Sequence, residues 1–314
     1  MTKRIIFIGG ATASGKSELG VNIAKEIGGE IISADSRQVY KNIPYFTGAI
    51  LKDEMKGVIH HLLSFLSEEK IFSVGEFQKK AEEKIKEICK KGKIPIIVGG
   101  SSFYFEPLIY KNLFPEVSQN KELRNELKEK SIEELFQILQ KKDKRRAEFI
   151  DKKNKPRLIR AIEIAEELGL VPELKKEMRG DYEIFFIWLS QPIENQREKI
   201  AKNVEKRMGQ GLLKEAEIVN KNLLKVLSPK EVKERFIKLG QAFKYIHDLW
   251  NEKINLDEFI EKTKVEEGRY AKRQNTYLKK FFSELPKQIL KVQYDLLDKN
   301  YQKQVLKDTK NFLK

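Results

Sequence analysis

A glycine-rich segment near the N-terminus has the residue types and spacing that bind a chain of phosphates. It fits the pattern G-x-x-x-x-G-K-[ST] with Gly10, Ala11, Thr12, Ala13, Ser14, Gly15, Lys16 and Ser17. The glycines permit a tight turn whose backbone N–H groups attract anionic oxygens, the lysine adds charge, and the serine hydroxyl can reach Mg²⁺. This chemistry predicts a ligand with linked phosphates and leaves open whose phosphates they are.

Asp35 is the carboxylate expected beside this loop. It follows the apolar run EIISA, which places it at the carboxyl edge of a parallel sheet, where the loop also lies. P-loop kinases and NTPases commonly hold Mg²⁺ with an acid after another buried strand, but the run KIPIIV ends in GGSS, at 99–102. A carboxylate next to a phosphate site suits a general base. Alternatively, Asp35 is a turn residue or the N-cap of a helix that begins at Ser36 or Arg37. Ser101 stands at the same edge, or acts as a cap.

The elements around these residues alternate in the N-terminal third. Short apolar runs at 5–8, 31–32 and 94–98 are too short for helices, whereas 15–27 and 74–91 have helical periodicity. This alternation predicts β-α-β units around a parallel sheet whose strands are buried on both faces. A match to the phosphate-loop pattern between a strand and a helix is credible, and a chance match in an arbitrary loop is the alternative.

The composition changes between 116 and 181 to charged, helix-forming sequence without a strand candidate. The segment YEIFFIWLS at 182–190 then has the character of another core strand, and the remainder is predicted to be helical. We therefore predict a catalytic core of residues 1–115 and 182–314, interrupted by a helical insertion domain of residues 116–181.

The charge balance favours a polyanionic partner. Lysine and arginine number 62 against 47 aspartate and glutamate residues, a net charge of +15. Nucleic acid is the first candidate and an anionic membrane surface the second, while the plain alternative is a set of solvated helix faces rich in lysine. No apolar run reaches the ~18 residues of a membrane span, and MTKRIIFIGG lacks a signal peptide's cleavage region. We expect a cytoplasmic protein without membrane association. The single Cys89 and three histidines offer no zinc spacing, so we predict no structural metal.

Several motifs in order resemble the tRNA dimethylallyltransferase family, also called tRNA isopentenyltransferases. The resemblance covers most of the chain. Besides the phosphate loop, it rests on SADSRQVY at 33–40, His60-His61-Leu62 followed by Phe77-Gln78, Val98-Gly99-Gly100-Ser101 with Tyr104, RLIRAIE at 157–163, and Tyr270-Ala271-Lys272-Arg273-Gln274.

The resemblance implies an α/β fold, with a P-loop NTPase-like parallel sheet core flanked by helices, a helical insertion subdomain and a helical C-terminal region. It implies that the loop holds the diphosphate of dimethylallyl diphosphate, with Mg²⁺ on Ser17. The dimethylallyl group would move to N6 of the adenosine 3′ to a tRNA anticodon, releasing diphosphate. Asp35 would be the base, Ser101 would lie between nucleophile and leaving group, and Lys16 would stabilise the departing diphosphate.

The resemblance also implies a surface for the tRNA anticodon stem-loop, to which the helical insertion contributes, and we take the enzyme to be a monomer. An anticodon base must leave its stack to reach the site, and contacts to the RNA offset that cost. The implied contacts are Asp35, Ser36, Arg37, Gln38, Ser101, Arg124, Arg157, Arg160, Lys272, Arg273 and Gln274. For each basic residue the alternative is a solvated helix charge.

Two departures from the family pattern concern the diphosphate and the C-terminal half. Lys199 and Asn203 stand where the family carries arginines, one of which holds diphosphate, and Arg207 lies one helical turn beyond Asn203. We assign Lys199 and Arg207 to diphosphate binding. Gly240-Gln241 replaces the usual Gly-Tyr.

Three alternatives remain open from the sequence. An adenylate isopentenyltransferase would modify free AMP, ADP or ATP and would not need a basic, helical surface for RNA. A P-loop kinase would transfer the γ-phosphate of ATP and would need a Mg²⁺-binding acid that the sequence does not offer after the strand at 94–98. A non-catalytic RNA-binding module would not need Lys16, Ser17 and Asp35 together.

Overall fold

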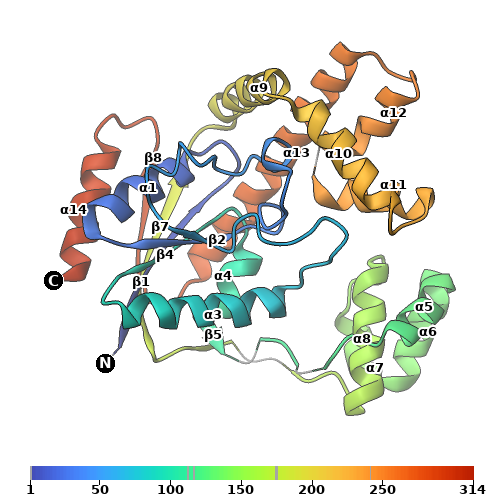
Figure 1. The fold of residues 1–314 in the computed structure, drawn as a ribbon. Coiled ribbons are helices and arrows are strands. Elements are labelled where there is room, and N and C mark those ends of the chain that lie inside the picture. The colour runs from blue at the N-terminus through green and yellow to red at the C-terminus, as the bar shows by residue number, and fades with distance from the viewer. Residues whose placement is uncertain (1, 112, 116, 174–175, 241) are drawn as a thin grey trace. The chain divides into compact units, whose positions relative to one another are not determined.

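The computed structural model describes residues 2–111, 113–115, 117–173, 176–240 and 242–314. In these residues, a parallel sheet of six strands is the framework of the fold (Figure 1). The strand order is β3-β2-β4-β1-β7-β8, and each neighbouring pair is parallel. The strands are β1 (Lys3–Gly10), β2 (Glu30–Ala34), β3 (His60–His61), β4 (Pro95–Gly99), β7 (Tyr182–Ser190) and β8 (Leu290–Asp295). The predicted α/β fold class is confirmed.

Helices cover both faces of this sheet, which explains the continuous apolar runs of its central strands. On one face, Ile6 and Ile8 of β1 pack in a cluster with Leu19 of α1 (Lys16–Ile27) and Val305 of α14 (Tyr301–Leu313). On the other face, the Phe7 ring meets Phe105 of α4 (Ser102–Ile109) edge to face, with 5.7 Å between centroids. Helices α3 (Val74–Lys90) and α13 (Leu256–Glu284) complete that layer.

Two strands of the sheet were not predicted. The C-terminal region was expected to be helical after 190, and β8 corrects this, because it pairs with β7 from Phe185↔Leu290 to Ser190↔Asp295. As an edge strand, β8 buries only Tyr294 and therefore has no continuous apolar run. The short strand β3 consists of two polar residues, and nothing in its sequence indicates a strand.

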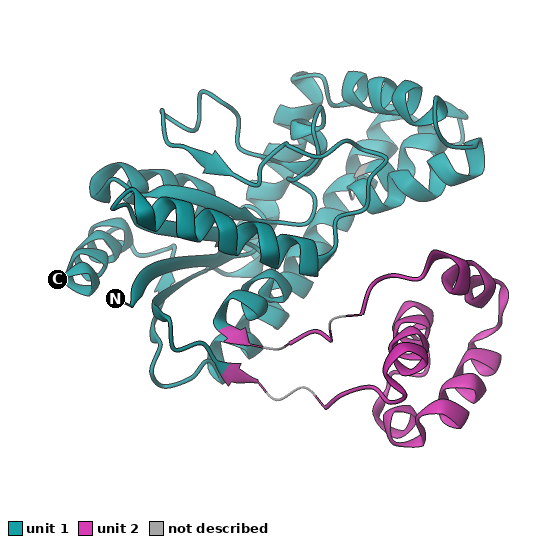
Figure 2. Ribbon diagram, turned by 60° about the horizontal axis from the view of Figure 1, so that its bottom comes forward, with its two compact units in different colours: residues 1–109, 178–314 teal, residues 110–177 magenta. Residues whose placement is uncertain are grey.

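The chain divides into two compact units, Met1–Ile109 with Met178–Lys314 and Tyr110–Glu177 (Figure 2). The second unit overlaps the insertion predicted at 116–181, whose first residue Glu116 lies outside the described residues. It contains α5 (Lys121–Glu129), α6 (Ile132–Lys142), α7 (Lys144–Phe149) and α8 (Lys155–Leu168), each begun by an Asn, Ser or Asp side chain that accepts a backbone N–H. The short strands β5 (Tyr110–Lys111) and β6 (Glu177–Met178) pair with each other, so the prediction of no strand in 116–181 was wrong.

After β7 the larger unit continues through α9 (Ile193–Gly209), α10 (Leu212–Leu224), α11 (Pro229–Leu239), the 3₁₀ turn η1 (Ala242–Tyr245), α12 (Ile246–Trp250) and α13. Asn255 and Glu258 form a capping box that begins α13, a helix of 29 residues. Helices α9 and α13 pack against the phosphate loop through Ile200, Val204 and Ala271. In the part of the chain that the structure describes, we find no helix with the length and apolar character needed to cross a membrane.

Candidate active site

The phosphate loop joins β1 to α1 and presents the N-terminus of that helix. Gly15 is the N-cap with a φ of 75°, and no described side chain caps the helix there. Ala13 also has a positive φ, of 62°. The first N–H groups of a helix have no partner within it, and the helix dipole is positive at this end. The loop can therefore bind anionic oxygens.

Three glutamine side chains hold the loop in place. Gln274 of α13 accepts two hydrogen bonds from Thr12, one from its N–H at 2.8 Å and one from its hydroxyl at 3.0 Å. Gln196 of α9 donates to the carbonyl oxygen of Thr12 at 2.7 Å, and Gln191 donates to that of Ala13 at 3.1 Å. Residues far along the sequence thus determine the backbone conformation of the loop.

The double glycine at the end of β4 allows close packing around the loop. A Cβ at Gly100 would lie 2.3 Å from Nε2 of Gln274, and one at Gly99 would lie 2.2 Å from the carbonyl oxygen of Ala34. Side chains at these positions would separate β4 from β2 and displace Gln274 from Thr12. The segment VGGS therefore permits the strand ends and α13 to approach each other.

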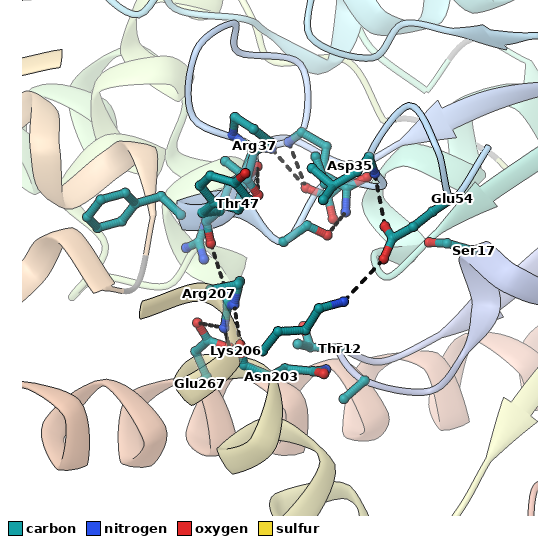
Figure 3. Close-up of a pocket in the computed structure, with 18 of the residues that line it drawn as sticks. Thr12, Ser17, Asp35, Arg37, Thr47, Glu54, Asn203, Lys206, Arg207 and Glu267 are labelled. Carbon is teal, nitrogen blue, oxygen red and sulfur yellow. Dashed lines mark hydrogen bonds and ion pairs between the residues drawn. The ribbon is translucent and has the colours of Figure 1, made fainter. Parts of the chain in front are cut away.

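A cavity of about 230 Å³ opens beside the loop (Figure 3). It is lined by the loop, the segment after β2, the helical turn α2 (Pro44–Thr47) with the residues after it, α9 and α13. Its charged and hydroxyl-bearing lining residues are Thr12, Lys16, Ser17, Asp35, Arg37, Tyr45, Thr47, Glu54, Lys206, Arg207, Glu267 and Tyr270. The structure thus brings the phosphate loop and Asp35 into one cavity.

The ammonium of Lys16 contacts the backbone of its own loop. Its Nζ donates to the carbonyl oxygen of Ala11 at 3.3 Å. Burial lowers the pKa of Lys16 below its usual value, and the charge of Asp35 acts in the opposite direction. A phosphate anion in the cavity would favour the charged form of Lys16, because an opposite charge stabilises it.

Asp35 is held in a turn at the end of β2. Its Oδ1 accepts the backbone N–H of Arg37 at 2.9 Å and that of Gln38 at 3.4 Å, while Oδ2 accepts no hydrogen bond from the described residues. Of the structural alternatives, the turn is therefore correct. The N-cap is wrong, because no helix begins at Ser36 or Arg37.

Two phenols lie near this carboxylate, the buried Tyr104 and the half-buried Tyr270. Burial raises the pKa of Tyr270, and the charge of Asp35 adds to the effect. Burial also raises the pKa of Tyr104, again reinforced by Asp35. The guanidinium of Arg37 lies over the Tyr270 ring, 4.5 Å from its centroid. Both phenols therefore remain neutral near pH 7.

The helical turn α2 forms one wall of the cavity and is fixed by buried charges. Glu215 accepts the backbone N–H groups of Tyr45 at 3.1 Å and Phe46 at 3.0 Å. Arg207 donates to the carbonyl oxygen of Tyr45 at 3.0 Å and to both carboxylate oxygens of Glu267 at 2.7 Å. Burial raises the pKa of Glu215 to about 7, against the effect of the two N–H groups and of Arg207.

The three other positions of interest on α9 differ in their relation to the cavity. Lys199 is not among the lining residues and donates to Oε1 of Gln191 at 2.9 Å. Asn203 and Lys206 both line the cavity. The Nζ of Lys206 lies 3.5 Å from Oε1 of Glu54. In Figure 3, Lys206 and Glu54 point toward each other.

Two arginines of the insertion surround a buried carboxylate inside the second unit. Arg124 donates to Glu163 through Nε at 2.9 Å and Nη2 at 2.8 Å, and Arg160 donates to it at 2.5 Å and to the carbonyl oxygen of Val117 at 2.8 Å. Burial acts to raise the pKa of Glu163, but the two arginines hold it below its usual value. Both therefore have a structural role within this unit, whereas Arg157 is exposed.

The remaining candidates lie apart from the cavity lining. Ser36, Lys272 and Arg273 are exposed, whereas Ser101 is half-buried in front of α4. Gln274 is buried against the loop. The substituted position Gln241 lies outside the described residues.

Four carboxylate and ammonium groups of the site were not predicted: Glu54, Lys206, Glu215 and Glu267. They come from a loop and three different helices, and their spacing matches no motif. The one signal for Glu215 and Glu267 is the presence of acidic residues among apolar positions of amphipathic helices, where a buried charge needs a partner.

The chain is similar to known proteins along nearly its whole length. The family model described as IPP transferase matches residues 38–281. The tRNA dimethylallyltransferase of a Thermoanaerobacter species is 37% identical over 289 residues, which cover 89% of this chain and 90% of that protein. The full-length tRNA isopentenylpyrophosphate transferase of Bacillus halodurans superposes with a TM-score of 0.68 at 27% identity, over 100% of this chain and 97% of that one. A eukaryotic dimethylallyltransferase, solved acting on tRNA, shares the fold with a TM-score of 0.83 at 23% identity, over 99% of this chain and 80% of that chain.

Proposed function

The chain belongs to the IPP transferase family, and from that premise we propose that it transfers a dimethylallyl group from dimethylallyl diphosphate to N6 of the adenosine 3′ to a tRNA anticodon. The observation that carries the proposal is the shared cavity. A phosphate loop with Lys16 and Ser17 and a carboxylate, Asp35, open into the same space. One end suits a leaving diphosphate and the other a base for the nucleophile.

At the phosphate end, the protein stabilises the charge that develops on the leaving group. The N–H groups of the loop and the first turn of α1 bind diphosphate oxygens, and Lys16 adds its positive charge. The hydroxyl of Ser17, an oxygen donor suited to Mg²⁺, also lines the cavity at this end. A magnesium ion bound by Ser17 and the diphosphate would supply further neutralisation of the leaving group.

At the other end, Asp35 assists a weak nucleophile. The lone pair of an adenine N6 amine is delocalised into the ring. The bond from N6 to the first carbon of the dimethylallyl group forms while the bond from that carbon to the diphosphate oxygen breaks, and the electron pair leaves with the diphosphate. Asp35 takes the proton from N6, using the oxygen that no described donor occupies. The resemblance implies that Ser101 would lie between nucleophile and leaving group, although its half-buried side chain is outside the cavity lining.

The proposed RNA-binding surface combines the segment after β2 with exposed basic side chains. The net charge of +15 supports a polyanionic substrate. We propose that Ser36, Arg37 and Gln38 contact the extruded base, and that Arg157, Lys272 and Arg273, with exposed side chains, contact phosphates. Arg124 and Arg160 contribute through the fold of the helical unit. Action on tRNA also supports a cytoplasmic location.

A donor and acceptor competition tests this function against its alternatives. The protein is incubated with labelled dimethylallyl diphosphate and either unmodified tRNA or AMP, and in parallel with labelled ATP. We expect label from the prenyl donor in tRNA. Label in AMP but not in tRNA would identify an adenylate isopentenyltransferase, and movement of ATP phosphate alone would identify a kinase.

A further inference from the structure

We propose that Lys206 is the cation of α9 that binds the diphosphate, and that Glu54 holds Lys206 when no diphosphate is bound. The proposal rests on the function above. It replaces our assignment of this role to Lys199 and Arg207. Asn203, which stands where an arginine was expected, carries no charge, so another residue of α9 has to supply the cation.

Arg207 lines the cavity, but its guanidinium is already engaged. It donates to the carbonyl oxygens of Asn203 at 3.1 Å and Tyr45 at 3.0 Å, and to both oxygens of Glu267 at 2.7 Å. The Arg207 side chain is 11% exposed and that of Glu267 is 7% exposed. Moving Arg207 to a ligand would leave the Glu267 carboxylate buried without its partner, which is strongly unfavourable. Arg207 therefore fixes the cavity wall.

Lys199 is engaged outside the cavity. Its Nζ donates to Gln191, whose own amide donates to the carbonyl oxygen of Ala13. Lys199 thus supports the phosphate loop through Gln191, and its side chain is absent from the cavity lining. Asn203 lies in the lining but carries no charge.

Lys206 combines the position in the cavity that Lys199 lacks with the freedom to move that Arg207 lacks. It lines the same cavity as Gly15, Lys16 and Ser17. Its pair with Glu54 is long, at 3.5 Å, and the two side chains are 59% and 43% exposed. Such exposed ion pairs contribute little free energy, and the lysine side chain is flexible. Lys206 can therefore exchange Glu54 for another anion at small cost.

Glu54 is held more firmly than its partner. Its Oε2 accepts the backbone N–H of Leu51 at 3.0 Å, which keeps the carboxylate at the cavity edge. A diphosphate carries more negative charge than one carboxylate, so it competes for Lys206 and is repelled by Glu54. Lys206 then raises diphosphate affinity, whereas Glu54 lowers it.

Binding of inorganic diphosphate tests both effects, the increase in affinity from Lys206 and the decrease from Glu54. Calorimetry measures it with a chelator present to remove divalent cations. We expect Lys206→Gln to weaken binding about tenfold, the loss of one charge-assisted contact, and Lys206→Arg to retain it. Glu54→Gln should tighten binding about two- to fivefold, since it removes a weakly screened repulsion. Lys202→Gln is the matched control, because Lys202 lies exposed on the same helix outside the lining, and it should bind as the wild type does.

Thermal melting of each variant establishes that it is folded. Equal affinity of Lys206→Gln and the wild type would overturn the proposal, as would weaker binding by Glu54→Gln, which would make Glu54 a positive contributor to the site. Failure of the wild type itself to bind diphosphate would instead count against the proposed function.

Discussion

Gln274, in the long helix α13, accepts two hydrogen bonds from Thr12 in the phosphate loop, at 2.8 and 3.0 Å. The two residues are 262 positions apart in the sequence. Gln274 is buried, and Gly100 leaves the space through which it reaches the loop. The C-terminal motif that contains Gln274 therefore contributes to the conformation of the loop as well as to the surface that carries Lys272 and Arg273.

Replacing Gln274 by methionine should weaken binding of the prenyl donor. Methionine keeps the length of the side chain but cannot accept the two hydrogen bonds, each worth about 1 kcal/mol, and leaves the Thr12 N–H without its partner. We expect the KM for dimethylallyl diphosphate to rise about tenfold or more, with tRNA affinity nearly unchanged. Steady-state kinetics measure the KM for dimethylallyl diphosphate, and filter binding measures the affinity for tRNA. A loss confined to tRNA affinity would assign Gln274 to RNA recognition instead.

The parts of the fold that the sequence predicted are those with a local pattern. The phosphate loop lies in one contiguous segment between a strand and a helix, and 182–190 was recognised as a strand because β7 is buried on both faces. The sequence does not predict the edge strand β8, because β8 buries only Tyr294 and so has no run of apolar residues. Leu290 at its start is exposed. Strand character there comes from pairing with β7, which is a tertiary effect.

The same distinction holds for the candidate site. Lys16, Ser17 and Asp35 belong to recognisable segments, and the structure places them in one cavity. Glu54 and Lys206 come from separate elements that meet only in the folded chain, and no spacing relates them. The sequence does not predict the ion pair between Arg207 and Glu267 either, because the pair depends on the packing of α9 against α13.

Asp35→Asn should abolish transfer while preserving the architecture around it. Asparagine keeps an oxygen that accepts the N–H groups of Arg37 and Gln38 but cannot take a proton from N6. We expect the rate of transfer to fall about 10²- to 10⁴-fold, the usual contribution of a general base. Single-turnover transfer and tRNA binding are measured together. A parallel loss of tRNA binding would show that Asp35 mainly recognises the substrate.

Substitution of Arg124 in α5 should change the stability of the protein, whereas substitution of Arg157 in α8 should change only its binding of tRNA. Arg124→Gln removes charge-assisted bonds to the buried Glu163 and should destabilise the helical unit by about 1–3 kcal/mol. Arg157→Gln changes an exposed side chain, so it should leave the melting temperature unchanged. If Arg157 contacts a phosphate, its loss weakens tRNA binding and lowers the salt slope by about 1.

Calorimetric melting and tRNA titrations at several salt concentrations distinguish these two outcomes. An Arg124→Gln variant as stable as the wild type would contradict the structural role of the Glu163 cluster. An unchanged salt slope for Arg157→Gln would mean that this charge is only solvated.

Glu215 should make stability depend on pH near neutrality. Burial raises the pKa of Glu215 to about 7, above its value in an unfolded chain. Between about pH 4.5 and 7, the folded protein retains a proton that the unfolded chain has lost, so the free energy of unfolding decreases as pH rises. Relative to Glu215→Gln, which does not titrate, the wild type should lose up to about 3 kcal/mol across this window and then level off. Urea denaturation of both proteins at several pH values measures this difference, and a difference independent of pH would contradict it.

If one cavity joins a bound diphosphate to a base for an RNA amine, the reaction yields one defined modified nucleoside, which analysis of the product detects. An unmodified anticodon stem-loop is incubated with the protein, Mg²⁺ and dimethylallyl diphosphate, then digested to nucleosides and examined by mass spectrometry. We expect N6-dimethylallyl adenosine from the position 3′ to the anticodon, with one diphosphate released per group transferred. Diphosphate release without modified adenosine, or a prenyl group on another atom or position, would contradict it.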